Sequence, residues 1–431
     1  MIGQRPREIA LRTLLEAREG GFIEDVLETH LAAADLPDND RGLCRELVFG
    51  TVRWRATLDW LISRRTQHRP QKAALEELLR LGLYQIFWLD RVPDHAAVHE
   101  TVNLSKAMGL VSQAGFINAV LRASLRDGEI IRAELARLRN EQPALGWSQP
   151  AWLVERWLAR WGAEKTAALL AWNNAAPSTF ARRNEIHFTA ADLEAAWTEE
   201  GVQALPKSFP WVEDRLVYEL ASHPPLGELQ SFLKGGFYVQ DPSTLLAVAE
   251  LDPQPGERIL DACAAPGGKA TYIAQRMQDR GEVIAEDSAQ GRLETVRENF
   301  MRLGLRSIAA VWADPDAEVP AGKSFDRILI DAPCSNTGVL RRRVQLRWRV
   351  RPDEIIRLRA DQLQILERCA PRLKPGGVLV YSTCSLETEE NEEVVAEFLA
   401  KHPEFTLERQ RALTPMDDGV DGAFVARMKK A

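Results

Sequence analysis

The C-terminal half of the chain, from about Leu233 onward, alternates short apolar runs with longer amphipathic stretches. This alternation constrains the fold most, because strands separated by helices build a parallel, doubly wound α/β sheet. The apolar runs predict strands over 258–264, 282–286, 308–312, 327–330 and 378–381, and residues 422–428 are apolar enough to add a final strand. The intervening stretches predict helices over 269–278, 290–303, 352–373 and 387–400.

The N-terminal part of the sequence has a different pattern. Between about residues 6 and 139, apolar residues recur at spacings of three and four, as in Leu75, Leu78 and Leu79, which predicts helices throughout. Residues 142–230 begin with a Trp-rich helical stretch, whose tryptophans we assign to packing, and continue with mixed patterns broken by prolines. A chain of 431 residues usually folds as two or three domains. We expect an all-α domain over 1–140, connecting helices with a small α+β subdomain over 141–232, and the α/β domain over 233–431.

Composition argues against several classes of protein. Hydrophobic residues make up 45% of the chain, and no apolar stretch approaches the ~20 residues needed to span a bilayer. The five cysteines are an odd number without CxxC or Cys/His spacing, so neither a disulfide framework nor a structural metal is indicated. The net charge of −7 argues against coating nucleic acid by bulk electrostatics, although a local patch can still bind it. We expect a monomeric cytoplasmic protein without a metal.

A Gly-rich loop follows the first strand of the predicted sheet. The strand reaches Asp261, the turn Pro266-Gly267-Gly268 comes next, and a helix is expected from about Lys269. Backbone N–H groups at the start of a helix attract an anionic or carboxylate-bearing ligand. Neither the dinucleotide fingerprint GxGxxG nor the phosphate loop GxxxxGK[ST] is present, so the remaining common ligand is S-adenosylmethionine.

Acidic residues at the ends of the next two strands support a nucleotide-like cofactor. Asp287 ends the second strand, where a carboxylate can accept hydrogen bonds from ribose hydroxyls. Asp314 follows the third strand and is placed to receive an adenine amino group. Any one of these acids alone is equally consistent with capping the helix that follows.

Two cysteines each close an apolar run downstream of this loop. Cys334 lies in the sequence DAPCSNTG and Cys384 in YSTCS. Because chemistry in such sheets gathers at the carboxyl ends of the strands, the two thiols and the Gly-rich loop are expected to share one pocket. This combination indicates a thiol that attacks a base beside a nucleotide-like cofactor. A lone cysteine in a strand is more often an inert buried thiol. We keep this interpretation for Cys44, Cys263 and Cys369, which are not expected to act as nucleophiles.

Four segments taken together resemble the RNA 5-cytosine methyltransferases of the Sun/NOL family, also called NOL1/NOP2/Sun: ACAAPGGKA, AEDSAQGRLETVRENFMRLGL, DAPCSNTGVLRRR and KPGGVLVYSTCSLETEENE. The N-terminal sequence RGLCRELVFGTVRWRATLDWLI is similar to the NusB-like RNA-binding domain found in that family. The resemblance implies an all-α NusB-like domain, a small α+β linker subdomain and a C-terminal Rossmann-like class I methyltransferase domain. It also implies S-adenosylmethionine as cofactor and methylation of C5 of a specific cytosine in 16S rRNA.

The resemblance further implies roles for individual residues. Cys384 is expected to add to C6 of cytosine and form a covalent adduct, and Cys334 to assist release of the methylated base. Asp331 is expected to contact N3 or the amino group of the target. Lys269, Asp287, Arg292 and Asp314 match cofactor-binding positions of the family. The remaining expected cofactor contacts are Cys263, Ala264, Ala265, Pro266, Gly267, Gly268 and, again, Asp331.

Two stretches depart from the family pattern. After Gly338 the family usually continues with His-Pro-Asp before a tryptophan, whereas this chain has RRRVQLRW. Near the C-terminus the chain has Ala423 where the family usually has an aromatic residue. Neither change touches the thiols or the Gly-rich loop.

Basic residues in two places predict contacts with RNA. The first set follows the Cys334 motif, where guanidinium groups can bind phosphates and a tryptophan can stack on a base. The second is the clearest basic cluster of the helical domain. The sets are Arg341, Arg342, Arg343, Arg347 and Trp348, and Arg64, Arg65, Arg69 and Lys72.

Other functions remain open at this stage. An RNA-binding ribosome-assembly factor with a catalytically idle methyltransferase fold would share most of the sequence pattern. An amino-group methyltransferase of similar fold would use an Asn/Asp-Pro-Pro-Tyr loop, which the sequence lacks. His95 and His99 have the spacing of two metal ligands, but the HExxH pattern is not matched and no third ligand is evident.

Overall fold

The computed structural model describes residues 5–314 and 324–431. These residues form two compact units. The first, called here the helical unit, contains the chain up to Ala175 together with Arg343–Arg349, and the second, the sheet unit, contains Ala176–Arg342 and Val350–Ala431. No helix in the described ranges is long and apolar enough to cross a membrane.

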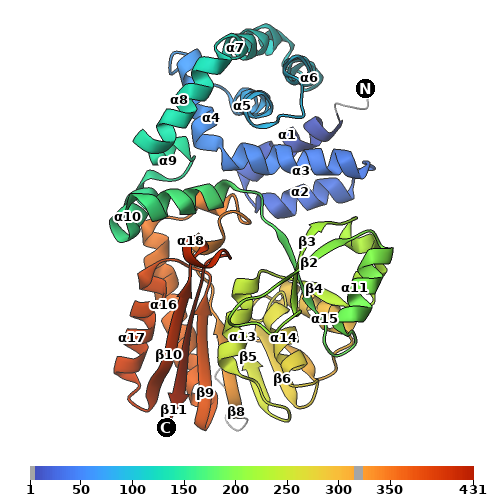
Figure 1. Cartoon of the computed structure of the whole chain (residues 1–431). Helices are drawn as coiled ribbons and strands as arrows, with labels where there is room; N and C mark the ends of the chain where they lie inside the picture. Colours follow the sequence, from blue (N-terminus) through green and yellow to red (C-terminus); the bar gives the residue numbers. More distant parts are fainter. Residues whose placement is uncertain (1–4, 315–323) are drawn as a thin grey trace. The chain divides into compact units, whose positions relative to one another are not determined.

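The helical unit is built from helices alone, as the spacing of its apolar residues predicts. Leu11, Leu47, Leu79 and Leu121 are completely buried and belong to one core. A Cβ at Gly50 would lie 1.9 Å from the ring of Tyr84, so only glycine allows that close approach. The helices, blue to green in Figure 1, are α1 (Arg5–Glu19), α2 (Ile23–Ala32), α3 (Asp38–Arg53), α4 (Arg55–Arg65), α5 (Ala73–Trp88), α6 (Asp94–Ala107), α7 (Ala114–Arg126), α8 (Gly128–Glu141), α9 (Pro143–Gly146) and α10 (Ala151–Asn174).

The Trp-rich stretch forms α10, which is interrupted at Gly162 by a positive φ of 75°. Trp157 is completely buried, which confirms packing as its role, and Trp152, Trp161 and Trp172 are half-buried.

A short segment from far along the sequence, 343–349, completes the helical unit. Val344 is buried in the core of that unit. The Arg347 side chain is completely buried and donates to Asn173 O at 2.8 Å, to Asn174 Oδ1 at 2.7 Å and to Arg53 O at 3.3 Å. These contacts fix the segment among α3 and α10.

The sheet unit begins with a small antiparallel sheet. Its strand order is β2-β3-β1-β4, and α11 (Ala190–Glu199) packs on it through Trp197, which contacts Tyr218 and Phe237 edge-on. Thr189 caps α11 and exchanges hydrogen bonds with Asp192, a capping box. The other elements are β1 (Thr179–Arg183), β2 (Gln203–Lys207), β3 (Val217–Ser222), β4 (Phe237–Val239) and α12 (Gln230–Leu233).

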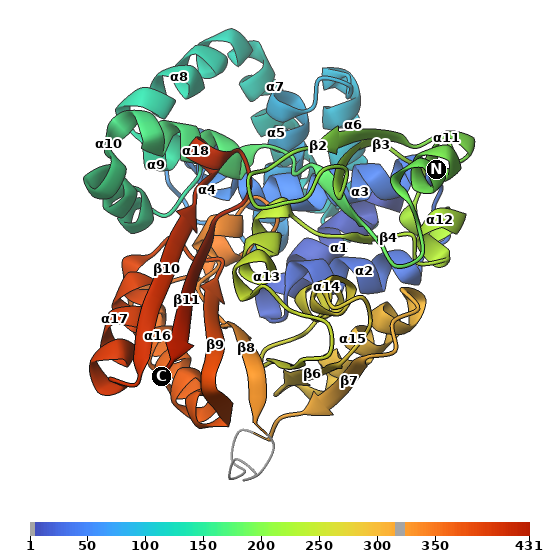
Figure 2. The same ribbon diagram turned by 60° about the horizontal axis from the view of Figure 1, so that its bottom comes forward.

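The main sheet of this unit has seven strands in the order β10-β11-β9-β8-β5-β6-β7 (Figure 2). The five strands β9, β8, β5, β6 and β7 run parallel, as predicted. The predicted final strand runs antiparallel to β9 and pairs with a further antiparallel strand that the sequence analysis missed, so the sheet is mixed. The strands are β5 (Arg258–Asp261), β6 (Glu282–Asp287), β7 (Ile308–Trp312), β8 (Phe325–Asp331), β9 (Leu373–Thr383), β10 (Phe405–Leu413) and β11 (Ala423–Lys430).

Helices cover both faces of this sheet. Ile259 packs into the core that includes α13, α14 and α15, whereas the next residue, Leu260, packs into the core that includes α16 and α17. This alternation follows from the two-residue period of a strand. The helices are α13 (Leu245–Leu251), α14 (Gly268–Arg276), α15 (Gln290–Arg302), α16 (Pro352–Cys369), α17 (Glu392–Lys401) and the short α18 (Pro415–Asp418).

Two predicted helix boundaries differ from the structure. The helix predicted to reach 373 ends at Cys369, because β9 already begins at Leu373. The helix predicted from 387 begins at Glu392, because residues up to Asn391 are used in the loop that follows β9. That loop supplies a part of the candidate site.

Candidate active site

The two cysteines of interest lie next to each other where β8 and β9 end. The strands are parallel neighbours in which Asp331 pairs with Ser382, so the loops that follow them start side by side. The sulfur atoms of Cys334 and Cys384 are 3.2 Å apart. The expectation that two residues far apart in sequence share one place is therefore met.

Asn336 links the two loops. Its backbone is left-handed, with φ of 59°, a conformation that asparagine tolerates better than most residues. Its side chain accepts a hydrogen bond from Cys384 Sγ at 3.1 Å and donates to Cys334 O at 2.6 Å. The hydrogen bond to Cys384 and burial raise the pKa of the Cys334 thiol well above its usual value. Cys334 therefore keeps its proton near neutral pH, while Cys384 is the more exposed thiol.

A completely buried carboxyl group, Glu390, supports both loops from below. It accepts hydrogen bonds from Ser335 N at 2.8 Å, from Ser385 Oγ at 2.5 Å and from Ser335 Oγ. Gln362 of α16 donates to Glu390 at 3.1 Å and to Pro333 O at 2.9 Å. Burial raises the pKa of Glu390 above its usual value. The network fixes the backbone on both sides of Cys334 and directly after Cys384.

Two glycines allow these loops to approach the start of β11. A Cβ at Gly338 would lie 2.7 Å from Gly422 Cα, and Gly422 N donates to Gly338 O at 2.9 Å. Gly338 N in turn donates to Cys384 O at 3.0 Å. Ala423, which departs from the family pattern, is buried beside this contact.

An ion pair lies at the same edge of the sheet. Lys269 Nζ is 2.6 Å from Asp331 Oδ2, and Ser382 Oγ donates to the other carboxylate oxygen at 3.1 Å. Burial by itself lowers the pKa of Lys269, but the Asp331 carboxylate outweighs it and holds that pKa above the usual value. Asp331 thus accepts hydrogen bonds through both oxygens.

The Gly-rich loop turns tightly between β5 and α14. Gly267 has φ of 102°, and a Cβ there would lie 3.3 Å from the Val296 backbone of α15. The loop contains a cis peptide bond before Pro266. Gly267, the residue before α14, provides no side-chain cap, so within the described residues the first N–H groups of that helix lack a capping side chain.

The predicted acids of the cofactor region take different positions. Asp287 accepts hydrogen bonds from Ala265 N at 3.1 Å and Ala289 N at 2.9 Å, and it is 4% exposed. Arg292 donates to Ala265 O at 2.8 Å, so it also holds the Gly-rich loop. The Asp314 backbone carbonyl accepts from Arg368 at 2.8 Å. Ala264 and Ala265 are buried beneath the loop.

Asp261, the last residue of β5, is completely buried, and neither of its carboxylate oxygens has a hydrogen-bond partner among the residues that the structure describes. Burial, with the nearby charge of Asp331, raises the pKa of Asp261 to about 7. An acid held in this way is an acceptor that a ligand's hydrogen-bond donor can satisfy. The sequence analysis used Asp261 only as the end of a strand.

Arg182, from the small sheet, is a supporting residue that the sequence analysis missed. It is completely buried and donates to Gly268 O at 2.8 Å and to Thr271 Oγ1 at 3.0 Å. Its guanidinium lies over the rings of Tyr238 and Tyr272. Burial lowers the pKa of Arg182 to about 10. No spacing in the sequence connects β1 with α14, so only the fold reveals this contact.

The arginines predicted to bind RNA after the Cys334 motif are mostly not available to it. Arg341 is 4% exposed and pairs with Asp421 at 2.6 Å and Asp241 at 3.3 Å. Arg342 pairs with the same two acids. Arg347 is completely buried in the helical unit, where burial lowers its pKa to about 9. The prediction fails for these three side chains because they bind acids and carbonyl groups of the protein itself. Arg343, in contrast, is exposed.

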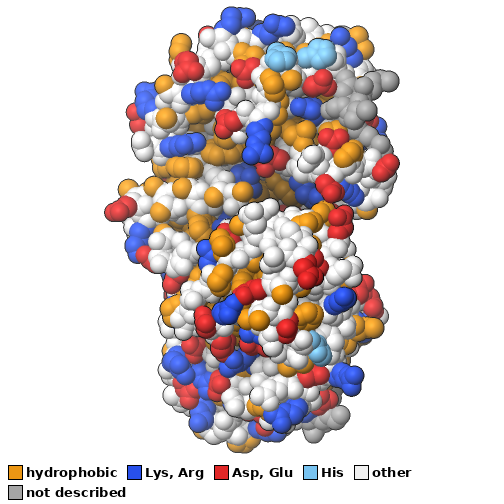
Figure 3. Space-filling view, turned by 45° about the vertical axis from the view of Figure 1, so that its right-hand side comes forward, with side chains coloured by type: hydrophobic (Ala, Val, Ile, Leu, Met, Phe, Trp, Pro, Cys, Tyr) orange, Lys and Arg blue, Asp and Glu red, His pale blue; other side chains and the backbone are white. Residues whose placement is uncertain are grey.

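The second predicted basic cluster is exposed but partly neutralised. Arg64 pairs with Glu134, and Arg65 pairs with Asp127 at 2.6 Å. Arg69 and Lys72 are exposed. Figure 3 shows Lys and Arg side chains interspersed with acidic and apolar ones on the visible face, without one continuous basic field.

The other cysteines lie apart from the thiol pair. Burial raises the pKa of Cys44 and of Cys369 to about 12 in each case. Burial also raises the pKa of Cys263, in the Gly-rich loop, well above its usual value. Within the described ranges, no three His, Cys, Asp or Glu side chains cluster in a way that would hold a metal ion.

Family models match three consecutive parts of the chain. The model of the 16S rRNA methyltransferase RsmB/F matches residues 248–429, and that of the NusB family matches residues 4–126. A model of the ferredoxin-like domain of RsmF/B-like methyltransferases matches residues 149–216.

Curated relatives match over nearly the full length. The probable ribosomal RNA small subunit methyltransferase B of Bacillus subtilis is 34% identical over 98% of this chain and 98% of its own. The ribosomal RNA small subunit methyltransferase B of Pseudomonas syringae pv. tomato is 38% identical over 92% of this chain and 87% of its own. Among solved structures, a methyltransferase homologue protein from Pyrococcus horikoshii is 29% identical, with a TM-score of 0.57 over 67% of this chain and 97% of its own.

Proposed function

Because the chain belongs to the RsmB/F family of 16S rRNA methyltransferases, we propose that it methylates C5 of one cytosine in small-subunit rRNA through a covalent adduct with Cys384. Methyl transfer to rRNA from S-adenosylmethionine is the activity of the family. The cytosine, the C5 position and the adduct are the proposal. The observation that carries it is the pair of thiols 3.2 Å apart at the edge of the sheet that also holds the Gly-rich loop and the Lys269–Asp331 pair.

The loop around Gly267 and Gly268 fits S-adenosylmethionine. The uncapped start of α14 suits the carboxylate of the cofactor, and the buried, unsatisfied oxygens of Asp261 suit its ammonium group. Asp287 and Arg292 hold the loop in shape, and Arg182 supports it from the small sheet. When bound, the cofactor supplies an electrophilic methyl group on a sulfonium.

The chemistry explains why a thiol is needed. C5 of cytosine is a poor nucleophile because the ring is aromatic. Addition of the Cys384 thiolate forms a C6–S bond and moves an electron pair toward C5, which makes C5 enamine-like. C5 then takes the methyl group, loses its proton to a base, and the C6–S bond breaks to return the thiolate. Cysteine suits both the addition and the elimination because its thiolate is a strong nucleophile and a competent leaving group.

Cys334 assists the elimination. Since the pKa of Cys334 is raised by its hydrogen bond to Cys384 and by burial, it is a thiol rather than a thiolate near neutral pH. At 3.2 Å its S–H can donate to the Cys384 sulfur as that sulfur gains negative charge on leaving C6.

Asp331 orients the base. The sequence analysis left N3 and the exocyclic amino group as alternative contacts. Both oxygens of Asp331 act as hydrogen-bond acceptors in the structure, which favours the amino group, a donor. Asn336 holds the Cys384 thiol while the base enters.

The test uses labelled S-adenosylmethionine and small-subunit rRNA with the full chain. Wild type should produce 5-methylcytosine. Cys384→Ala should lose at least about 10³-fold in rate and form no denaturation-resistant RNA adduct, because the nucleophile is absent. Cys334→Ala should accumulate the adduct, because elimination is slowed. Cys44→Ala, which removes a buried thiol of the helical unit, is the matched control and should keep wild-type activity.

Other outcomes have definite meanings. If the protein binds the cofactor and RNA but methylates no form of the rRNA, it is an assembly factor with an idle fold. A methyl group on an amino nitrogen, or an adduct that survives in Cys384→Ala, would contradict the proposed chemistry.

A further inference from the structure

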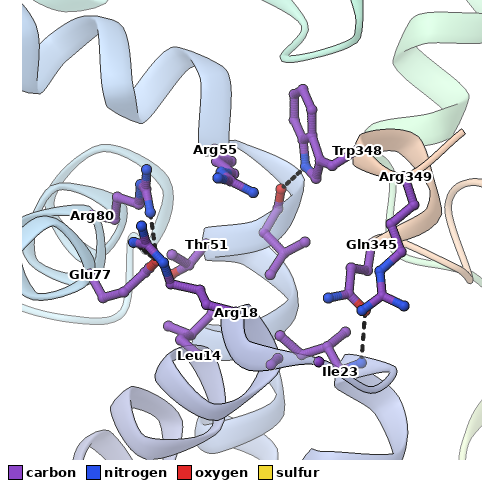
Figure 4. Close-up of a pocket in the computed structure, with 13 residues that line it drawn as sticks. Leu14, Arg18, Ile23, Thr51, Arg55, Glu77, Arg80, Gln345, Trp348 and Arg349 are labelled. Carbon is purple, nitrogen blue, oxygen red and sulfur yellow. Dashed lines mark hydrogen bonds and ion pairs between the residues drawn. The ribbon is translucent and has the colours of Figure 1, made fainter. Parts of the chain in front are cut away.

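The helical unit contains a cavity of about 390 Å³ that has no part in the chemistry above (Figure 4). It lies among α1, the start of α2, α3, α4 and α5, and the 343–349 segment closes it. All of its lining residues belong to the helical unit. Its volume lies in the range of small-ligand sites, roughly 300–1,000 Å³.

The charges around this cavity are unequal. Its lining includes four arginines, Arg18, Arg55, Arg80 and Arg349, but a single acid, Glu77. Arg80 is balanced, since it pairs with Glu77 at 2.5 Å and with Asp59 at 2.6 Å.

Arg18 and Arg349 are also engaged. Arg18 pairs with Glu77 at 3.0 Å and with Glu76 at 3.2 Å. Arg349 donates to Gly21 O and lies over the Phe22 ring.

Arg55 is the exception. In the parts of the chain that the structure describes, it makes no hydrogen bond and no ion pair. Its pKa is lowered by burial first and by the neighbouring charge of Arg80 second. Figure 4 shows it between Arg80 and Trp348. Arg55 is exposed at the mouth of the cavity. Because its guanidinium is repelled by the one of Arg80, it favours the arrival of an anion, and guanidinium groups bind phosphate oxygens with two parallel hydrogen bonds.

Trp348 provides a fixed aromatic surface beside this charge. Its ring is half-buried, and Nε1 donates to Val52 O at 2.7 Å. Gln345 holds the same segment by accepting from Ile23 N at 2.9 Å, and Arg347 anchors it from within. Because the tryptophan is already immobilised, a base that packs against it costs little side-chain entropy.

We propose that this cavity binds one unpaired nucleotide of the RNA substrate, with its phosphate at Arg55 and its base against Trp348. This inference rests on the proposed function, because it takes RNA to be the substrate. A phosphate explains the need for the surplus arginine, and a base explains the aromatic side chain and the apolar wall that Leu14 and Val52 provide. The site differs from the basic cluster at Arg64–Lys72, because it is a cavity with an aromatic side chain beside the charge.

The test measures the affinity of the full-length protein for a short single-stranded oligoribonucleotide in the absence of the cofactor. The measured affinity does not depend on methyl transfer, so a failure of the proposed reaction would not affect it. Arg55→Gln should weaken binding about 10-fold near 100 mM salt. It should also reduce the slope of log K against log salt by roughly 0.7, the value for one lost phosphate contact on a single strand. Arg55→Lys should keep most of the affinity, because it keeps the charge.

The matched control is Arg12→Gln on α1, since Arg12 is exposed and pairs with Glu8 away from the cavity. It should bind as wild type does. Trp348→Leu should weaken binding about 5-fold while Trp348→Phe retains most of it, because an aromatic face persists. Unchanged S-adenosylmethionine binding and thermal unfolding would show that the variants are folded.

Two results would overturn the proposal. The first is an Arg55→Gln protein with wild-type affinity and salt slope. The second is a pair of observations: inorganic phosphate competes with the oligoribonucleotide as well as cytidine 5′-monophosphate does, and Trp348→Leu has no effect on binding. The cavity would then be an anion site without a place for a base.

Discussion

The candidate active site at the edge of the sheet and the cavity of the helical unit are built on opposite principles. Around the thiols, side chains are held by other side chains: Glu390 accepts from both cysteine loops, and Lys269 faces Asp331. In the cavity, Arg80 and Arg18 are paired, while Arg55 has no ion pair with any residue in the described ranges. The contrast teaches that a site for chemistry is preorganised by satisfied contacts, whereas a site for holding a ligand keeps an unsatisfied charge. Asp261, the buried acid without a partner, is the part of the sheet edge that behaves like the cavity.

The largest expected effect follows from breaking the ion pair at the sheet edge. Lys269→Met leaves Asp331 and Asp261 without the cation between them, so methyl transfer should fall by roughly 10³-fold. The control is Lys374→Met, since Lys374 also pairs with an aspartate, Asp326, at 2.6 Å but is exposed. Methylation rates of the two variants measure the difference. Equal rates would show that the buried pair has no special role.

The next effect concerns the network beneath the loops. Glu390→Ala removes the acceptor of four hydrogen-bond donors and should lower the free energy of unfolding by roughly 3 kcal/mol. Glu393→Gln, on the exposed side of α17, should change it by less than about 0.5 kcal/mol. Denaturant unfolding of both variants checks this. A small effect of Glu390→Ala would mean that the loops are held by packing instead.

The pH dependence of stability tests Asp261. Its pKa is about 7 in the folded protein because of burial and Asp331, against roughly 3.9 when unfolded. Between these two pH values the folded state binds more protons at Asp261 than the unfolded state does. The contribution of Asp261 to the free energy of unfolding is therefore greatest at low pH and is lost as pH rises toward 7. From pH 5 to pH 7 the loss should be about 2 kcal/mol, and Asp261→Asn should remove it. The exposed Glu294→Gln should retain the wild-type slope, and a slope unchanged in Asp261→Asn would refute the assignment.

The smallest effect is expected at the exposed basic cluster. Because Arg64 and Arg65 already pair with acids, only Arg69 and Lys72 are left to attract phosphates. Neutralising both with glutamine should weaken oligoribonucleotide binding about 3-fold, less than Arg55→Gln alone. Filter-binding titrations compare the two proteins. If the double variant binds more weakly than Arg55→Gln, the cluster rather than the cavity is the main RNA contact.

The sequence predicted the location of the two cysteines because their motifs are local. Cys334 and Cys384 end strands, and the rule that parallel strands end at one edge was enough to bring them together. Lys269 and Asp331 were singled out only by the family resemblance, and their ion pair was not predicted. The alternation of apolar runs also predicted the five parallel strands.

What the sequence could not predict depends on partners far away in the chain. Arg341 and Arg347 look like any exposed basic residue until the fold supplies Asp421 and the carbonyl of Asn173. Glu390 lies in a stretch of several acidic residues, and the sequence gives no sign that this one is buried and accepts hydrogen bonds from both cysteine loops. Strand β10 was missed because most of its residues face solvent at the edge of the sheet, so its apolar alternation is weak.

The 343–349 segment has a consequence for how such proteins are dissected. The helical unit needs Val344 and Arg347, so a fragment that stops at Ala175 would lack part of its core and leave Asn174 without its arginine. The two units are joined by three crossings of the chain rather than one. A helical unit expressed alone would therefore need residues 343–349 supplied with it to complete its core.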